Sequence, residues 1–350
     1  MECNKVIPIR NVFYMLSYAF QVLNENGYKK LGTEEFSNAG DMCAAILIKG
    51  VNNQIRRGLR REYVSCSDSL SALKGRINIT ESIKQNTLIK HQMVCSFDDF
   101  SPNCYLNKIV YSTLKLLLKA NISSDRKREL RKILVYFDGV EELDIHRIEW
   151  HVQYDKNNQN YRMLISICYL VVKGLIQTTS EGTIKMMDFF DEQRMCRLYE
   201  KFILEYYRKH FPSLCVNASQ IEWALDEEDD DSLLPVMKTD ITIENRQNNR
   251  ILVIDAKYYS SNLQEQYNKY TIHSNNLYQI FTYVKNLEAL YGNEKNISGM
   301  LLYARTTDAV QPNGVYHMSG NIIAVNNLDL DVEFENIANA LNRIAEEYLF

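Results

Sequence analysis

The sequence predicts an α/β (α+β) protein, with a mainly helical first part followed by a part whose mixed central sheet is flanked by helices. In the first part, long segments carry apolar residues at helical spacing. In the second part, such segments alternate with short apolar β-type runs. The polar stretch Gln153–Asn160 separates them. A length of 350 residues suggests two domains, which we place at 1–157 and 158–350.

The first part contains four segments with helical periodicity. The first has Val12, Met15, Leu16 and Ala19 on one stripe. The predicted helices cover residues 11–24, 44–61, 106–120 and 125–136. Between them, residues 73–79 are predicted as a short strand or loop and residues 94–97 as a strand.

The second part begins with predicted helices at 161–176 and 191–210. An acidic run, Asp226 to Asp231, is predicted to be a solvated loop. From residue 216 onward, on both sides of this run, predicted strands and helices follow in the order strands, helix, strand, strand, helix. They cover residues 216–221, 237–244, 250–259, 274–291, 299–304, 322–325 and 333–348.

Composition excludes several classes of protein. The net charge of −4 argues against binding of nucleic acid through global charge, so local basic patches or a partner must help. The eight scattered cysteines form no C-x-x-C pair, which predicts reduced thiols and a cytoplasmic protein. No secretory signal is recognisable, and no apolar run approaches the ~18 residues of a membrane span. The sequence has no phosphate-binding G-x-x-x-x-G-K-[ST] loop, so no nucleotide site is expected.

Two neighbouring predicted strands carry the candidate catalytic residues. Side chains two apart on a strand share a face, so Asp255 and Lys257 project together. If 237–244 pairs with this strand as a hairpin, Asp240 lies beside Asp255. Two adjacent carboxylates repel unless a cation neutralises them, and Mg²⁺ prefers such oxygen ligands. A salt-bridged strand edge at the surface is the alternative interpretation of the same residues.

Two features favour catalysis. The charged residues interrupt an apolar strand, which is costly without a purpose. The following helix has Gln279 and Tyr283 four residues apart on one face, where they can reach the site.

The arrangement resembles the PD-(D/E)xK nuclease superfamily, and the wider sequence resembles its McrC family, the nuclease subunits of McrBC modification-dependent restriction systems. The similarity extends over nearly the whole chain. It rests on residues Ile7–Ala19, Leu73–Ile77, Leu106–Val110, Met237–Ile243, Ile251–Tyr259 and His273–Gln279.

The resemblance implies Mg²⁺-dependent DNA hydrolysis in a restriction-endonuclease-like domain. Asp240 and Asp255 would bind the metal and Lys257 would be the charged catalytic group, although Thr239 replaces the family's proline. Gln279 and Tyr283 resemble an accessory Q-x-x-x-Y feature. Many members add a helix glutamate, here Glu200 or, as second choice, Glu205. An exposed helix glutamate beside Lys201 is the alternative.

The resemblance also implies a partner, an McrB-like hexameric AAA+ ring that binds GTP and recognises DNA containing modified cytosine. The first domain would then dock on this GTPase and stimulate it. Candidate contacts to the partner or to DNA are basic side chains, for each of which a solvated surface position is the alternative. They are Arg56, Arg57, Arg60, Arg61, Lys74 and Arg76.

Two other functions stay open on the sequence. The chain could be a non-catalytic activator or scaffold of an AAA+ ring with a vestigial nuclease site. It could also be a stand-alone nuclease of the same superfamily, which the net negative charge makes less attractive.

Overall fold

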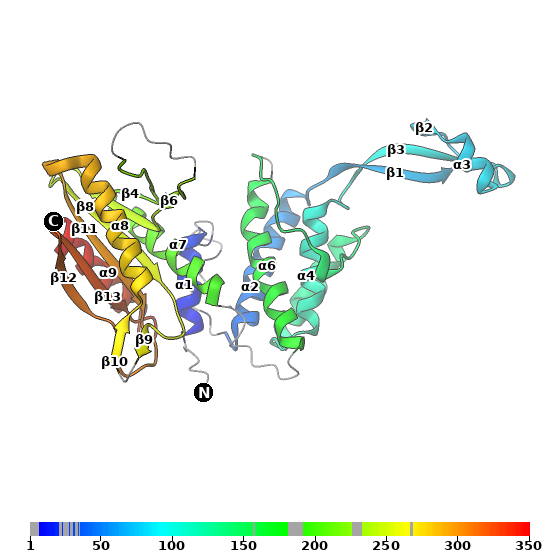
Figure 1. Cartoon of the computed structure of the whole chain (residues 1–350). Coiled ribbons are helices and arrows are strands. Elements are labelled where there is room, and N and C mark those ends of the chain that lie inside the picture. The colour runs from blue at the N-terminus through cyan, green and yellow to red at the C-terminus, as the bar shows by residue number, and fades with distance from the viewer. Residues whose placement is uncertain are drawn as a thin grey trace. The chain divides into compact units, whose positions relative to one another are not determined.

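The computed structural model describes most of the chain (Figure 1). The described residues are 7–20, 23, 28, 31, 34, 36–156, 158–180, 192–225, 233–266 and 269–350, with only the backbone described at 175–180, 192, 194, 265 and 266. The predicted acidic loop from Asp226 to Asp231 lies outside them. No helix within these ranges is long and apolar enough to cross a membrane.

The chain forms two compact units, and their boundaries differ from the division expected at residue 157. Residues 1–35 and 190–350 form unit 1, and residues 36–189 form unit 2. Helix α1 (Ile9–Ala19) belongs to unit 1, because Asn11 Nδ2 donates hydrogen bonds of 2.8 Å to the carbonyl oxygens of Leu330 and Val332. Helix α6 (Gln159–Ser180) packs in unit 2. Both differences come from contacts between segments distant in sequence.

Unit 2 contains a helical core formed by α6 together with α2 (Ala39–Arg57), α4 (Tyr105–Lys119) and α5 (Ser124–Leu134). The predicted helices 106–120, 125–136 and 161–176 correspond to α4, α5 and α6, whereas α2 begins five residues before the predicted 44–61 and ends four residues before it. The Asp41 carboxylate in the first turn of α2 accepts a hydrogen bond of 3.0 Å from the Ser123 amide, which fixes the start of α5. The side chains of Leu130 and Ile133 are buried, so the face of α5 that carries them packs against the helical core.

A long arm built on two paired strands is only partly predicted by the sequence (Figure 1). Strand β1 (Glu62–Leu70) pairs antiparallel with β3 (Met93–Ser101) over nine residue pairs. At its far end, β2 (Arg76–Ile77) pairs antiparallel with β3 as a short third strand. We call β2, the turn 71–75, α3 (Ile79–Lys84) and a 3₁₀ turn (Thr87–Lys90) together the arm tip. The predicted strand 94–97 lies within β3 and the predicted strand or loop 73–79 contains β2, whereas β1 was not predicted. Strand β1 has small polar residues in place of alternating apolar ones, so it carries no strand signal.

Unit 1 is built on a mixed six-stranded sheet in the order β12-β13-β11-β8-β7-β4, as the fold class predicts. Strand β11 runs parallel to β8 and β13, and the other pairs are antiparallel. The predicted strands appear, and β12 was not predicted. The bounds are β4 Cys215–Asn217, β7 Ile241–Asn245, β8 Arg250–Lys257, β11 Asn296–Ala304, β12 Gly314–Met318 and β13 Asn321–Leu328.

Smaller elements flank this sheet. Strands β5 (Gln220–Ile221) and β6 (Met237–Lys238) form one short antiparallel pair. Strands β9 (Leu263–Gln266) and β10 (Lys269–Ile272) form another.

Helices cover the sheet on both faces. Helix α8 (Ser274–Tyr291) packs Ile280 and Val284 against a core cluster that includes Val253 and Leu301. A Cβ at Gly299 would lie 2.8 Å from both of those α8 side chains, so glycine permits this close approach. Helices α7 (Glu192–His210) and α9 (Phe334–Leu349) contact β8 as well.

Candidate active site

The position of Asp240 depends on a break between two strands that the sequence suggested to be one. Strand β6 ends at Lys238 and β7 begins at Ile241. Buried Thr239 holds the break, because its amide donates to the Ser219 carbonyl oxygen at 2.9 Å and its Oγ1 lies 2.8 Å from Thr242 Oγ1. Asp240 therefore lies immediately before β7, and its carboxylate can turn toward β8.

The two predicted carboxylates meet as expected. Ile241 pairs with Ile254, so Asp240 lies opposite Asp255 in the antiparallel register. Asp240 Oδ2 also accepts a hydrogen bond of 2.9 Å from the Ala256 amide. This backbone contact fixes the Asp240 carboxylate one residue beyond Asp255.

Asp255 and Lys257 form a buried ion pair. The Lys257 Nζ to Asp255 Oδ2 distance is 2.8 Å, and the two side chains are 13% and 1% exposed. Burial disfavours the Lys257 ammonium, but the charge of Asp255 outweighs this effect and raises the Lys257 pKa. The alternative of a surface salt bridge therefore fails, since this pair lies inside the protein.

Gln279 and Tyr283 extend the polar arrangement from α8. Lys257 Nζ donates to Gln279 Oε1 at 3.1 Å, and Gln279 Nε2 donates to Tyr283 Oη at 2.9 Å. Tyr283 Oη in turn donates to the Lys238 carbonyl oxygen at 3.0 Å, immediately before the break. The i, i+4 pair thus positions the lysine and links α8 to the segment that carries Asp240.

The site brings three acidic side chains, Asp240, Asp255 and Glu200, into a largely buried environment. Burial, with the charges of Asp255 and Glu200, raises the pKa of Asp240 to about 8. Without a bound cation, Asp240 is therefore largely protonated at neutral pH. A divalent cation would favour the ionised form and relieve the repulsion.

This shift predicts how stability depends on pH in the metal-free protein. Between the ordinary pKa of 3.8 and about 8, the unfolded chain has ionised Asp240 while the folded chain keeps it protonated. The free energy of unfolding should fall across this window by about 1–4 kcal/mol and then level off. Asp240→Asn preserves the acceptor for Ala256 and should remove this dependence. Thermal unfolding of both proteins in chelator across this pH range measures the difference, and identical pH profiles would contradict it.

Of the two candidate helix glutamates, the structure associates Glu200 with the site. Burial raises the Glu200 pKa, and Lys257 and Asp255 both act on its charge. Its Oε1 accepts a hydrogen bond from Cys196 Sγ at 3.2 Å. Glu205 instead pairs with Lys201 and Arg208, each at 2.9 Å, so it serves the packing of α7.

The residues present suit a small hard cation. Asp255 Oδ2 is fully buried and accepts no hydrogen bond of regular geometry from the described residues, although it contacts Lys257. Among those residues, no group of three or more His, Cys, Asp or Glu side chains could by itself enclose a metal. Mg²⁺ is commonly held by one or two carboxylates with water and substrate phosphate, and Asp240 and Asp255 match that donor set.

The six basic residues predicted to contact a partner or DNA lie in unit 2, and some of them already pair with acidic side chains. Arg56 and Arg57 are exposed at the end of α2, and Arg61 is exposed before β1. Arg60 is engaged internally, at 2.6 Å from Glu62 and 3.9 Å from Asp155.

Two further basic candidates belong to the arm. Lys74 pairs with Asp99 at 3.2 Å and lies 4.2 Å from the centre of the Phe97 ring. Arg76 is exposed on β2. Binding of a partner or of DNA by these six basic residues stays a prediction.

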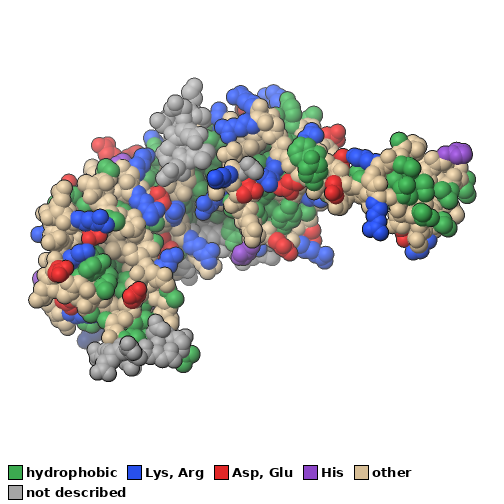
Figure 2. Space-filling view, turned by 90° about the horizontal axis from the view of Figure 1, so that it is seen from above, with side chains coloured by type: hydrophobic (Ala, Val, Ile, Leu, Met, Phe, Trp, Pro, Cys, Tyr) green, Lys and Arg blue, Asp and Glu red, His purple; other side chains and the backbone are tan. Residues whose placement is uncertain are grey.

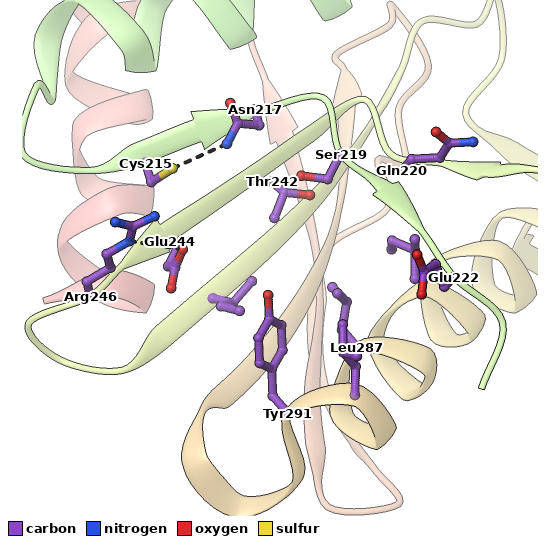
Figure 3. Close-up of a pocket in the computed structure, with 13 residues that line it drawn as sticks. Cys215, Asn217, Ser219, Gln220, Glu222, Thr242, Glu244, Arg246, Leu287 and Tyr291 are labelled. Atoms are coloured by element: carbon purple, nitrogen blue, oxygen red, sulfur yellow. Dashed lines mark hydrogen bonds and ion pairs between the residues drawn. The ribbon is translucent and has the colours of Figure 1, made fainter. Parts of the chain in front are cut away.

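A cavity of about 320 Å³ lies elsewhere in unit 1, between β4, β7 and α8 (Figure 3). Its lining includes Cys215, Glu244, Arg246 and Tyr291 but none of the six predicted site residues. The buried carboxylates and lysine of the candidate active site lie outside this cavity.

Comparisons with known proteins place the chain in a family. Residues 5–304 match the model described as McrBC 5-methylcytosine restriction system component. The chain belongs to the McrBC 5-methylcytosine restriction system component family. It is 33% identical to the type IV methyl-directed restriction enzyme EcoKMcrBC of Escherichia coli K12, over 98% of this chain and 99% of that protein.

A solved structure supports the fold assignment of this McrBC family member. The chain resembles a chain of the Thermococcus gammatolerans assembly of McrB AAA+ hexamers with bound McrC, with a TM-score of 0.51 and 16% identity. The match covers 96% of this chain and 76% of the other. The resemblance inferred from short sequence segments is thus confirmed at the level of family and fold.

Proposed function

We propose that this McrBC family member is the DNA endonuclease subunit of a GTP-dependent, modified-cytosine-specific restriction complex. The observation that carries the proposal is the buried Asp255–Lys257 pair with Asp240 held opposite it by the Ala256 amide. Nuclease chemistry needs these groups together, because phosphodiester hydrolysis places negative charge where a cation and a lysine can stabilise it. The family relationship adds the substrate, since the family description specifies 5-methylcytosine restriction.

In this proposal, Asp240 and Asp255 hold Mg²⁺, which when bound polarises the phosphate and lowers the pKa of water. Lys257, fixed by Asp255 and Gln279, orients the attacking water and stabilises the charge that develops on the phosphate oxygens. The water oxygen forms a bond to phosphorus as the bond to the leaving sugar oxygen breaks. Glu200 assists from α7 as a nearby proton acceptor.

The proposal assigns partner docking to unit 2. The Thermococcus gammatolerans assembly contains McrB AAA+ hexamers with bound McrC, and we propose a similar hexameric GTPase ring as this chain's partner. The arm tip offers a surface for it, with clustered apolar side chains at its outer end (Figure 2). Exposed patches of this kind commonly mark protein interfaces. The exposed apolar residues are Leu73, Ile77, Ile79, Ile83, Leu88 and Ile89.

Substitution at the arm tip should separate docking from folding. Ile89, 81% exposed, has little role in the fold, so Ile89→Asp should leave the unfolding temperature nearly unchanged. It should weaken stimulation of the partner's GTPase by about tenfold or more, because a charge would be buried at the interface. A GTPase assay against increasing concentrations of each chain measures this. The matched control is Val310→Asp, at a 49% exposed position of unit 1; an equal loss in both variants would contradict the assignment.

A reconstituted cleavage assay tests the whole function. Wild-type chain, partner ring, GTP and Mg²⁺ should cleave DNA containing 5-methylcytosine. Omission of the partner, GTP or modification, or chelation of the metal, should abolish cutting, and restored Mg²⁺ should recover it. Cleavage by the chain alone would instead support a stand-alone nuclease. GTPase stimulation without any cleavage would support a scaffold with a vestigial site.

A further inference from the structure

The two units carry opposite net charge, which the overall value of −4 conceals. Unit 2 contains 22 lysines and arginines against 16 acidic residues, a net charge of +6. Unit 1, which carries the candidate active site, contains 18 against 28, a net charge of −10. A polyanion such as DNA is therefore repelled by the unit proposed to cut it and attracted by unit 2.

Helix α5 presents the most concentrated basic surface of a single described helix in unit 2. Buried Leu130 and Ile133 fix one face toward the helical core. The opposite face carries the exposed side chains Arg128, Arg131 and Lys132 at i, i+3 and i+4 spacing. We call these three residues, with partly buried Lys127, the α5 basic face.

Repulsion among the charges of the α5 basic face lowers the stability of the helix. Lys127 with Arg131, and Arg128 with Lys132, place like charges four residues apart, where they repel. The two acidic residues of α5 form i, i+3 pairs near its start, Asp125 with Arg128 at 3.4 Å and Glu129 with Arg126 at 3.3 Å. Arg131 and Lys132 lie beyond this region, in the last turn. An anionic ligand along this face would relieve the repulsion.

Exposed side chains beside the α5 basic face add contact surface. Val135 and Tyr136 directly follow the helix and are 74% and 61% exposed. A ring next to clustered cations suits a nucleic acid, whose sugars and bases offer apolar and stacking contacts between phosphates.

We propose that the α5 basic face of unit 2 binds the phosphate backbone of DNA and so supplies the attraction that the acidic nuclease unit lacks. The inference rests on the proposed function in taking DNA as the substrate. It adds a binding surface outside the active site. Its contacts are to phosphates, so the surface is independent of sequence and of base modification.

Equilibrium binding without metal tests this proposal separately from cleavage. Fluorescence anisotropy of a labelled duplex should be measured with the full chain in chelator, across a series of salt concentrations. Arg128→Gln, Arg131→Gln and Lys132→Gln together should weaken binding about tenfold or more and reduce the slope of log affinity against log salt by about 2–3. No cleavage takes place in chelator, so a failed nuclease assignment would not affect this readout.

A charge-matched triple variant is the control. Arg147→Gln, Lys156→Gln and Arg162→Gln remove the same charge from exposed positions elsewhere in unit 2 and should leave affinity and slope nearly unchanged. Equal weakening by both triples would show a general charge effect and overturn the proposal. Unchanged DNA binding by the α5 variant would also overturn it. If that variant instead lost stimulation of the partner's GTPase, the surface would belong to the partner protein.

Discussion

Asp255→Asn is expected to lower DNA cleavage by the reconstituted complex by about 10³-fold or more, since it removes a proposed metal ligand and the anion that holds Lys257. Stimulation of the partner's GTPase should persist, because the substitution lies in unit 1 and the proposed docking surface lies in unit 2. Single-turnover cleavage and GTPase hydrolysis measured on the same preparation give both values.

Glu244→Gln is the matched control for Asp255→Asn. Glu244 lies on the neighbouring strand β7 and pairs with Lys295 at 2.7 Å, away from the site residues. Glutamine keeps an oxygen that can accept the hydrogen bond from Lys295, so the variant should fold and leave cleavage close to wild type. Undiminished cleavage by Asp255→Asn would remove Asp255 from the active site.

Lys257→Met is expected to damage both cleavage and stability. Loss of the ammonium should lower cleavage by about 10²–10³-fold. It leaves the 1% exposed Asp255 without its charge partner, which should lower the free energy of unfolding by about 3–5 kcal/mol. Denaturant unfolding at neutral pH measures the second effect. Because the Lys257 pKa is raised, this stabilisation is present throughout neutral pH and is lost only in alkaline solution.

A double variant distinguishes lost charge pairing from lost packing. Asp255→Asn combined with Lys257→Met removes both charges, so most of the stability lost in Lys257→Met should return. Cleavage should stay absent. A double variant that is no more stable than Lys257→Met would contradict the ion-pair explanation.

The core of the site could be predicted because its residues are local in sequence. Alternation along a strand places Asp255 beside Lys257, and helical spacing places Gln279 beside Tyr283. The hairpin connection brings Asp240 opposite Asp255. These arrangements depend on few residues, so the pattern was sufficient.

Other features depend on distant contacts and could not be predicted in the same way. The break at Thr239 is held by Ser219, twenty residues earlier. The place of α1 in unit 1 depends on the Leu330 and Val332 carbonyl groups. Nine residue pairs join β1 to β3 in the arm, and β1 lacks the alternation of apolar and polar residues from which a strand is predicted. The charge difference between the units became visible once the structure assigned residues to each.

Asp240 and Asp255 are proposed to hold a divalent cation together, and a metal titration measures this without any need for cleavage. Mn²⁺, a spectroscopic substitute for Mg²⁺, can be titrated by electron paramagnetic resonance into wild type, Asp240→Asn, Asp255→Asn and the Glu244→Gln control. We expect binding by wild type and Glu244→Gln, and affinity weakened about tenfold or more in each aspartate variant, since each loses one of two carboxylate ligands. Unchanged Mn²⁺ affinity in both aspartate variants would contradict a cation site formed by these two carboxylates.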